Sequence, residues 1–230
     1  MLGSLPLAIW CFGMFLEVAF LVCSIVRKSF FSYFFLNLYF LLELISEIAR
    51  YLVLARIGQT SSAYRYTYYY TDALLTLVLY LALISLYSRV FGELQLGKYL
   101  RLMAVFLLLG TVFFTYSVVA QSTGRLTSKF AYDLSQNLYF VGLVLTYVLW
   151  GAILKLRETR TRVVQFVLAL GIYFSAYAAI YAFVNLGGKY AFMSNLAPVL
   201  GCLLPLSWTF TMWRHKEEER LIPAQVFATQ

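Results

Sequence analysis

The chain has 230 residues, of which 62% are hydrophobic, 19% aromatic and only 12% charged. A soluble domain carries about 25% charged and about 45–50% apolar residues, so this composition excludes a water-soluble fold. The net charge of +8 is spread over short loops between apolar runs, which favours membrane topology over nucleic-acid binding. We therefore expect an all-α, polytopic membrane protein.

Seven apolar stretches are long enough to cross about 30 Å of hydrocarbon as helices. The expected spans are residues 6–26, 30–55, 66–88, 99–121, 136–156, 163–185 and 194–213. The first stretch lacks a basic leader and a small-residue cleavage site, which indicates a retained helix. The predicted organisation is one seven-helix transmembrane domain, residues 1–213, followed by a short tail, residues 214–230.

The basic residues predict the orientation of this bundle. Of the 18 Lys and Arg residues, twelve fall in the loops on one side and in the tail, and six fall on the other side. Because cytoplasmic loops collect positive charge, the twelve-residue side is predicted to be cytoplasmic. The N-terminus is then outside and the C-terminus is cytoplasmic, most simply in a bacterial inner (plasma) membrane, with the lipid bilayer as the first partner.

Several kinds of chemistry are missing from the predicted spans. The only histidine is His215, in the tail, so intramembrane bis-histidine haem and three-histidine zinc sites are excluded. Cys11, Cys23 and Cys202 have no metal-ligand spacing, and the last span has no lysine for a retinal Schiff base. We therefore expect no cofactor, no metal and no catalytic residue.

Four acidic residues lie inside the predicted spans. They are Glu17 in the first span, Glu43 and Glu47 in the second, and Asp72 in the third. A charged side chain costs about 2.5–3.5 kcal/mol at the centre of an inserted helix, so such residues usually face the bundle interior and mark function. Glu43, Glu47 and Arg50 follow at intervals of four and three and share one helical face.

Polar side chains of other spans are expected near these acids. Tyr69 shares the face of Asp72, and Tyr173, Tyr177 and Tyr181 form a stripe on the sixth span at the spacing of a helix. The hypothesis is an outward-facing polar cavity between the second, third and sixth helices. Its ligand- or cation-binding residues are Glu43, Glu47, Arg50, Asp72, Tyr69, Tyr173 and Tyr177, with Glu17 as a further candidate. Asn137, Tyr139, Asn185 and Asn195 are expected to cap the outer ends of helices.

A structural interpretation of the same residues stays open. In it, Glu47 pairs with Arg50, the acids hold helices together by hydrogen bonds, and the tyrosines of residues 64–70 form an interfacial aromatic belt. We favour the belt for that tyrosine run and the cavity for the acids. The basic residues Lys155, Arg157, Arg160 and Arg162 are interpreted as orientation signals rather than as a lipid head-group site.

The second and third spans also carry a family resemblance. Phe30-Phe-Ser-Tyr-Phe-Phe-Leu-Asn-Leu-Tyr and Tyr66-Thr-Tyr-Tyr-Tyr-Thr-Asp resemble segments of a group of bacterial seven-helix integral membrane proteins. In that group an aromatic run precedes an acidic residue; here Tyr70 stands where Trp is common, and Asp72 matches the acid. The resemblance covers about the first 100 residues and implies only a stand-alone seven-helix bundle.

Three function classes follow. The first is a non-catalytic membrane protein, either a receptor-like module or a membrane subunit of a larger complex, with a partner membrane protein or a separate effector chain. The alternative is a small ion-coupled or solute transporter that uses the buried carboxylates. An intramembrane enzyme ranks last, because no base, metal cage or cofactor anchor accompanies the acids.

Overall fold

The computed structural model describes residues 4–58, 61–91, 97–120, 126–155, 160–186 and 190–215. In these ranges all regular secondary structure is α-helical. The described residues form seven helices, which are α1 (Ser4–Val26), α2 (Phe34–Ile57), α3 (Ser62–Phe91), α4 (Gly97–Ala120), α5 (Leu126–Lys155), α6 (Thr161–Asn185) and α7 (Tyr190–Arg214).

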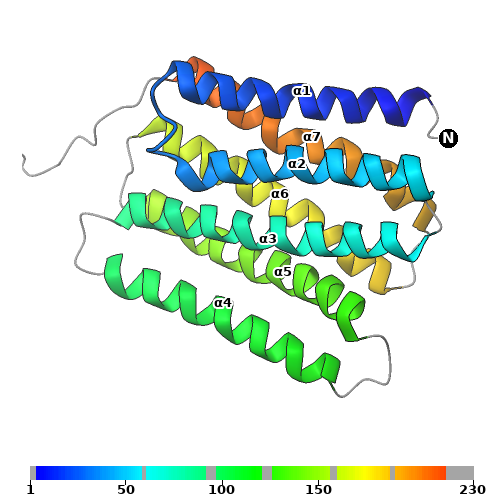
Figure 1. The fold of residues 1–230 in the computed structure, drawn as a ribbon. Helices are drawn as coiled ribbons and strands as arrows, with labels where there is room; N and C mark the ends of the chain where they lie inside the picture. Colours follow the sequence, from blue (N-terminus) through cyan, green and yellow to red (C-terminus); the bar gives the residue numbers. More distant parts are fainter. Residues whose placement is uncertain are drawn as a thin grey trace, which may run out of the picture.

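The helices lie side by side and alternate in direction (Figure 1). Helix α3 packs against α2, α4, α5 and α6, α1 packs against α2 and α7, and α4 packs against α3 and α5. We call the end that holds the turn between α1 and α2 the Tyr33 end, and the opposite end, where α2 stops at Gly58, the Gly58 end. The C-terminal end of α7 lies at the Tyr33 end.

Membrane character follows from length and composition. Within the described residues, four helical segments are long and apolar enough to span a bilayer, namely Ala8–Val26, Ser62–Phe91, Lys129–Lys155 and Thr161–Asn185. Helix α2 has comparable length, but it carries Glu43, Glu47 and Arg50 in its middle and second half. The chain therefore has the helices expected of an integral membrane protein.

Each predicted span overlaps one of these helices, and the ends differ by four residues or fewer except at the start of α5. The sequence predicts a loop up to Ser135, but α5 begins at Leu126. Ala131 and Leu134 are buried at the three-residue spacing of a helix, and Lys129 and Asp133 are electrostatic neighbours one turn apart. The prediction that Asn137 and Tyr139 cap the outer end of this helix is therefore wrong.

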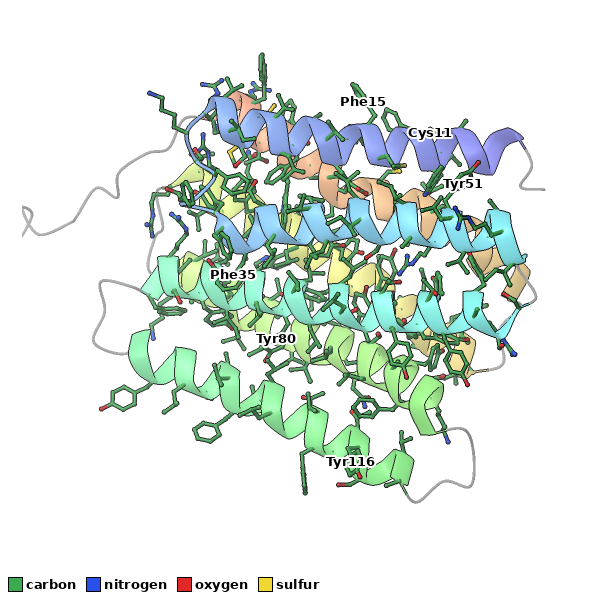
Figure 2. The ribbon with its side chains drawn as sticks, viewed as in Figure 1. Cys11, Phe15, Phe35, Tyr51, Tyr80 and Tyr116 are labelled. Carbon is green, nitrogen blue, oxygen red and sulfur yellow. The ribbon has the colours of Figure 1, made fainter. Side chains whose placement is uncertain are left out.

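Aromatic side chains fill the core between the first two and the last two helices. The Trp208 ring on α7 lies 6.1 Å from Phe20, 5.5 Å from Phe40 and 5.6 Å from Phe166, measured between ring centroids. Its indole nitrogen donates to the backbone oxygen of Phe166 at 3.2 Å. On α3, Tyr80 reaches the Ala104 oxygen of α4 at 3.0 Å, whereas Phe15 on α1 points away from the bundle (Figure 2).

Two glycines allow α5 and α6 to approach closely. A methyl group on Gly142 would meet the Phe174 ring at 2.6 Å, and one on Gly171 would meet the Trp150 ring at the same distance. The Phe174 ring is fully buried, and the Trp150 indole is fixed by a 3.1 Å hydrogen bond to the Val167 oxygen. Each helix thus has a glycine at the point where an aromatic side chain of the other helix packs against its backbone.

We expect Gly142→Ala and Gly171→Ala each to lower the free energy of unfolding by about 1–3 kcal/mol, because the added methyl group overpacks a closed contact. Unfolding in mixed micelles of dodecyl sulfate and a mild detergent, followed by circular dichroism, measures this. Gly151→Ala is the matched control, since a methyl group there meets nothing within 4 Å. Equal stability of all three variants would contradict the close-approach argument.

Candidate functional site

Three carboxylates from α1 and α2 lie together about midway along the bundle. Glu17 is only 3% exposed and lies close enough to Glu43 and Glu47 to interact electrostatically with both. In the described structure the Oε2 atoms of all three side chains are buried and have no hydrogen-bond partner. We call Glu17, Glu43 and Glu47 the carboxylate cluster.

Helix α7 closes the cluster on a further side. Cys202 lies within electrostatic reach of all three carboxylates, and its thiol donates weakly to the Ile9 oxygen of α1 at 3.7 Å. Gly13 of α1 packs toward the Cys202 sulfur. The cluster is therefore bordered by α1 and α7 as well as by its own helix α2, and these two helices were not part of the predicted group of the second, third and sixth.

Glu43 also has a neighbour toward α6. The Tyr39 hydroxyl, one turn earlier on α2, donates to Glu43 Oε1 at 3.2 Å. The same hydroxyl lies 3.5 Å from the Tyr173 hydroxyl of α6. Both tyrosines are less than 5% exposed, so these polar groups meet inside the bundle.

Further tyrosines continue from Tyr173 toward the Gly58 end. Ring centroids are 4.6 Å apart for Tyr173 and Tyr177, 5.0 Å for Tyr177 and Tyr139, and 5.6 Å for Tyr139 and Tyr181. The Tyr139 and Tyr177 rings are stacked almost in parallel, at 11°. We call Tyr39, Tyr139, Tyr173, Tyr177 and Tyr181 the tyrosine cluster.

Asp72 lies at the far end of the tyrosine cluster. The Tyr181 hydroxyl donates to Asp72 Oδ2 at 3.5 Å, and Ser135 of α5 lies beside the same carboxylate. The arrangement brings Asp72 of α3 into contact with α5 and α6, while Arg50 of α2 lies within its electrostatic reach.

Arg50 does not bond to a carboxylate among the described residues. Its Nε donates to the Thr71 hydroxyl at 2.7 Å and its Nη2 to the Tyr68 oxygen at 3.4 Å, and its guanidinium lies 4.5 Å from the centre of the Tyr68 ring. Glu47 and Arg50 therefore make no direct ion pair in the described structure, although Arg50 lies within electrostatic reach of Glu47. Arg50 instead ties α2 to α3, since its planar head suits both hydrogen bonds and ring contact.

The remaining predicted polar residues are more peripheral. Tyr69 is partly buried and meets Tyr132 edge-on at 6.2 Å between ring centroids. In the run of residues 64–70, Tyr68 and Tyr70 are 43% and 49% exposed, as an interfacial belt requires. Asn185 is exposed at the last residue of α6, and the side chain of Asn195 lies outside the described residues.

Basic side chains at the Tyr33 end bind backbone oxygens at the ends of helices. Arg162 is 2% exposed and donates to the His215 oxygen and to the Ser29 hydroxyl, both at 3.1 Å. Arg27 donates to the Trp213 oxygen at 2.6 Å, and Arg160 donates to the Arg89 oxygen at 2.7 Å. These arginines cap the carboxyl ends of α3 and α7, so two members of the predicted orientation cluster are structural.

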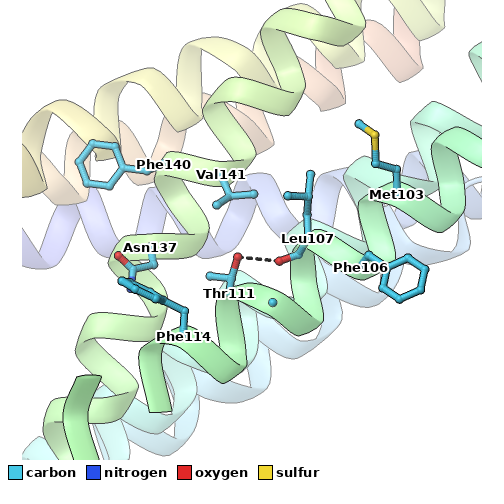
Figure 3. Close-up of a pocket in the computed structure, with 9 residues that line it drawn as sticks. Met103, Phe106, Leu107, Thr111, Phe114, Asn137, Phe140 and Val141 are labelled. Carbon is cyan, nitrogen blue, oxygen red and sulfur yellow. Dashed lines mark hydrogen bonds between the residues drawn. The ribbon is translucent and has the colours of Figure 1, made fainter. Parts of the chain in front are cut away.

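An open apolar pocket of about 540 Å³ lies between α4 and α5 (Figure 3). Phe106 and Phe114 border it on α4, Val141 and Phe140 border it on α5, and Asn137 is its main polar group. The Asn137 amide donates to the Thr115 hydroxyl at 3.0 Å. The described residues that line this pocket include none of the carboxylate cluster, Asp72 or any other acidic residue.

Three tyrosines of the tyrosine cluster are not among the predicted binding residues: Tyr39, Tyr139 and Tyr181, of which Tyr181 is placed only on the tyrosine stripe of the sixth span. Tyr39 stands four residues before Glu43, a spacing that places both on one helical face and could have identified it. The sequence places Tyr139 at a helix end, because its polar composition moves the predicted start of α5 ten residues past Leu126. Among the described residues no group of three His, Cys, Asp or Glu side chains has the arrangement of a metal site.

Comparison with protein families, with curated proteins and with solved structures finds no match to the chain. The interpretation of the site therefore depends on its own geometry.

Proposed function

We propose that the chain is a non-catalytic integral membrane protein, receptor-like or a membrane subunit of a larger complex, that binds a cation at the carboxylate cluster. All seven helices cross the bilayer in this proposal, with the N-terminus outside and the C-terminus in the cytoplasm of a bacterial cell. The excess of basic residues in the loops on one side supports that orientation. A partner membrane protein or a separate effector chain would receive the signal.

The observation that carries the proposal is the set of three unpartnered carboxylate oxygens of Glu17, Glu43 and Glu47. Buried charges are normally paired, and carboxylates that share a site repel one another unless a proton or another cation neutralises them. Arg50 is engaged by Thr71 and Tyr68. A bound cation or proton is thus the simplest partner for the cluster.

The expected result is cation-dependent stability. In lipid nanodiscs, the unfolding temperature of the wild-type protein should rise by several degrees when the pH falls from 8 to 5.5, because protons then neutralise the carboxylates. A ligand that binds the folded state alone stabilises it, and the three carboxylates meet only in the folded protein. Glu43→Gln should reduce this rise by at least half, as measured by tryptophan fluorescence.

Asp133→Asn is the matched control, because Asp133 is a partly exposed acid of α5 next to Lys129. It should keep the wild-type response. If Glu43→Gln keeps the full response as well, the carboxylate cluster is not the cation site.

The second candidate function is an ion-coupled transporter. It is favoured by the tyrosine cluster, which lies between the carboxylate cluster at mid-bundle and Asp72 nearer the Gly58 end. Proteoliposomes that contain a pH-sensitive dye distinguish the two functions. A flux that is lost in Glu43→Gln and Asp72→Asn supports transport, whereas no flux above protein-free liposomes supports the receptor-like function.

A further inference from the structure

We propose that Asp72 and Glu43 exchange a proton through the hydroxyl groups of the tyrosine cluster, so that the proton is the cation the carboxylate cluster takes up. This inference rests on the proposed function, since it requires Glu43 to bind a cation. It adds the identity of that cation and its path.

The two ends of the path are hydrogen bonds to carboxylates. At one end the Tyr39 hydroxyl donates to Glu43 at 3.2 Å, and at the other the Tyr181 hydroxyl donates to Asp72 at 3.5 Å. The next link from Glu43 is the Tyr173 hydroxyl, 3.5 Å from that of Tyr39. Each acid therefore has a tyrosine hydroxyl as its immediate neighbour.

The middle of the path is formed by three tyrosines on two helices. Tyr177 and Tyr139 both lie beside Tyr173, with ring centroids 4.6 Å and 6.3 Å from that of Tyr173. The Tyr139 ring in turn contacts the Tyr181 ring, with 5.6 Å between centroids. Since a tyrosine hydroxyl is both donor and acceptor, each group here can pass on one proton while it receives another.

Packing alone does not explain these hydroxyls. Tyr39, Tyr139 and Tyr173 are all less than 5% exposed, and phenylalanine would fill the same space without burying a polar group. A buried hydroxyl costs free energy unless it is hydrogen-bonded. Their gathering between two acids is what a proton path requires.

The transfer conserves protons and needs no other reactant. The Asp72 carboxylic acid gives its proton to the Tyr181 oxygen, and each hydroxyl in turn releases its own proton to the next oxygen. The last O–H bond to break is that of Tyr39, and the last to form is on Glu43. At the end Asp72 is a carboxylate, Glu43 is a neutral acid, and every tyrosine again carries one proton.

Charged and titratable groups on all neighbouring helices influence the two acids. Around Glu43 they are Glu17, Glu47, Arg50, Tyr39, Tyr173, Tyr177 and Cys202. Around Asp72 they are Arg50, Tyr68, Tyr139, Tyr177 and Tyr181. Arg50 lies near both acids, so it favours a negative charge on whichever has lost its proton.

The test follows the protonation of each acid separately after a rapid fall in pH, by time-resolved infrared spectroscopy of the full chain in nanodiscs. The carboxylic-acid band of Glu43 is the one that Glu43→Gln removes, and the band of Asp72 is the one that Asp72→Asn removes. Tyr39→Phe and Tyr173→Phe should slow the appearance of the Glu43 band at least tenfold and leave the Asp72 band unchanged.

Tyr80→Phe is the matched control, because it removes a buried hydroxyl that bonds to the Ala104 oxygen instead of to the path. It should leave unchanged the rates at which the Glu43 band and the Asp72 band appear. Asp72→Asn provides a second variant. It should also slow the appearance of the Glu43 band tenfold, since it removes the first proton donor.

The path is wrong if the Glu43 band appears at the wild-type rate in Tyr39→Phe, Tyr173→Phe and Asp72→Asn. The tyrosine hydroxyls would then have no role in proton transfer. That outcome leaves the proposed function intact if Glu43→Gln still removes the cation-dependent stability. If no carboxylic-acid band depends on Glu43, both the cation site and the path are wrong.

Discussion

Arg162→Ala is expected to lower the free energy of unfolding by about 3 kcal/mol, because hydrogen bonds from a charged group contribute about 1.5–3 kcal/mol and their loss leaves buried acceptors unsatisfied. The guanidinium is almost fully buried. It joins three segments, since it extends from α6 to the Ser29 hydroxyl between α1 and α2 and to the His215 oxygen after α7. Unfolding in mixed micelles measures the change.

Arg214→Ala is the control for this prediction. Arg214 is also basic and lies at the same end, but it is exposed and lies over the Phe210 ring at 5.5 Å. An exposed cation–π contact contributes about 0.5–1 kcal/mol. Arg162→Lys should recover little stability, because an ammonium group lacks the planar fork of a guanidinium. If Arg162→Ala is no less stable than Arg214→Ala, the capping interpretation is wrong.

Trp208→Ala should be the most destabilising of the core substitutions, with a loss of about 3–5 kcal/mol. The side chain is fully buried and contacts aromatic rings of α1, α2 and α6. The surrounding rings cannot all collapse into the space, so dispersion contacts are lost on several helices at once.

Two variants separate packing from hydrogen bonding at this position. Trp208→Phe keeps a ring but loses the bond to the Phe166 oxygen, so it should cost less than Trp208→Ala. Trp213→Ala removes the same side chain type from the same helix at a position that is 63% exposed, and it should cost under about 1 kcal/mol. Similar losses for Trp208→Ala and Trp213→Ala would contradict the assigned core.

The positions of the helices could largely be predicted, because a long continuous apolar run satisfies its backbone hydrogen bonds in a membrane by forming a helix. The exception was the start of α5, where Lys129, Asp133 and Ser135 gave residues 126–135 the composition of a loop. Helix formation there depends on burial of Ala131 and Leu134, which is a tertiary effect. A polar composition shows that a segment contacts a polar environment, but it does not show at which residue a helix begins.

The acids of the site were identifiable from the sequence, and so were the α6 neighbours Tyr173 and Tyr177, but the neighbours on α1, α5 and α7 were only partly so. The cost of burying a charge singles out Glu43, Glu47 and Asp72 whatever the fold. Which helix faces them depends on rotation and packing order, and so Glu17 and Cys202 join Glu43 and Glu47 only in three dimensions. Likewise, charge counting treats Arg162 as one of many loop residues, whereas its burial distinguishes it in the structure.

The division of the carboxylate cluster between two helices has a mechanical consequence. Glu17 is on α1, and Glu43 and Glu47 are on α2, so any repulsion between the first and the other two acts across the contact between those helices. Two charges several ångströms apart in a protein repel by a few kcal/mol, comparable with a substantial part of a domain's stability. The Thr209–Leu16 hydrogen bond of 3.3 Å joins α1 to α7 on its other side. A charge on Glu17 together with a charge on Glu43 or Glu47 therefore weakens the packing of α1 against α2, and neutralisation of Glu17 removes this repulsion.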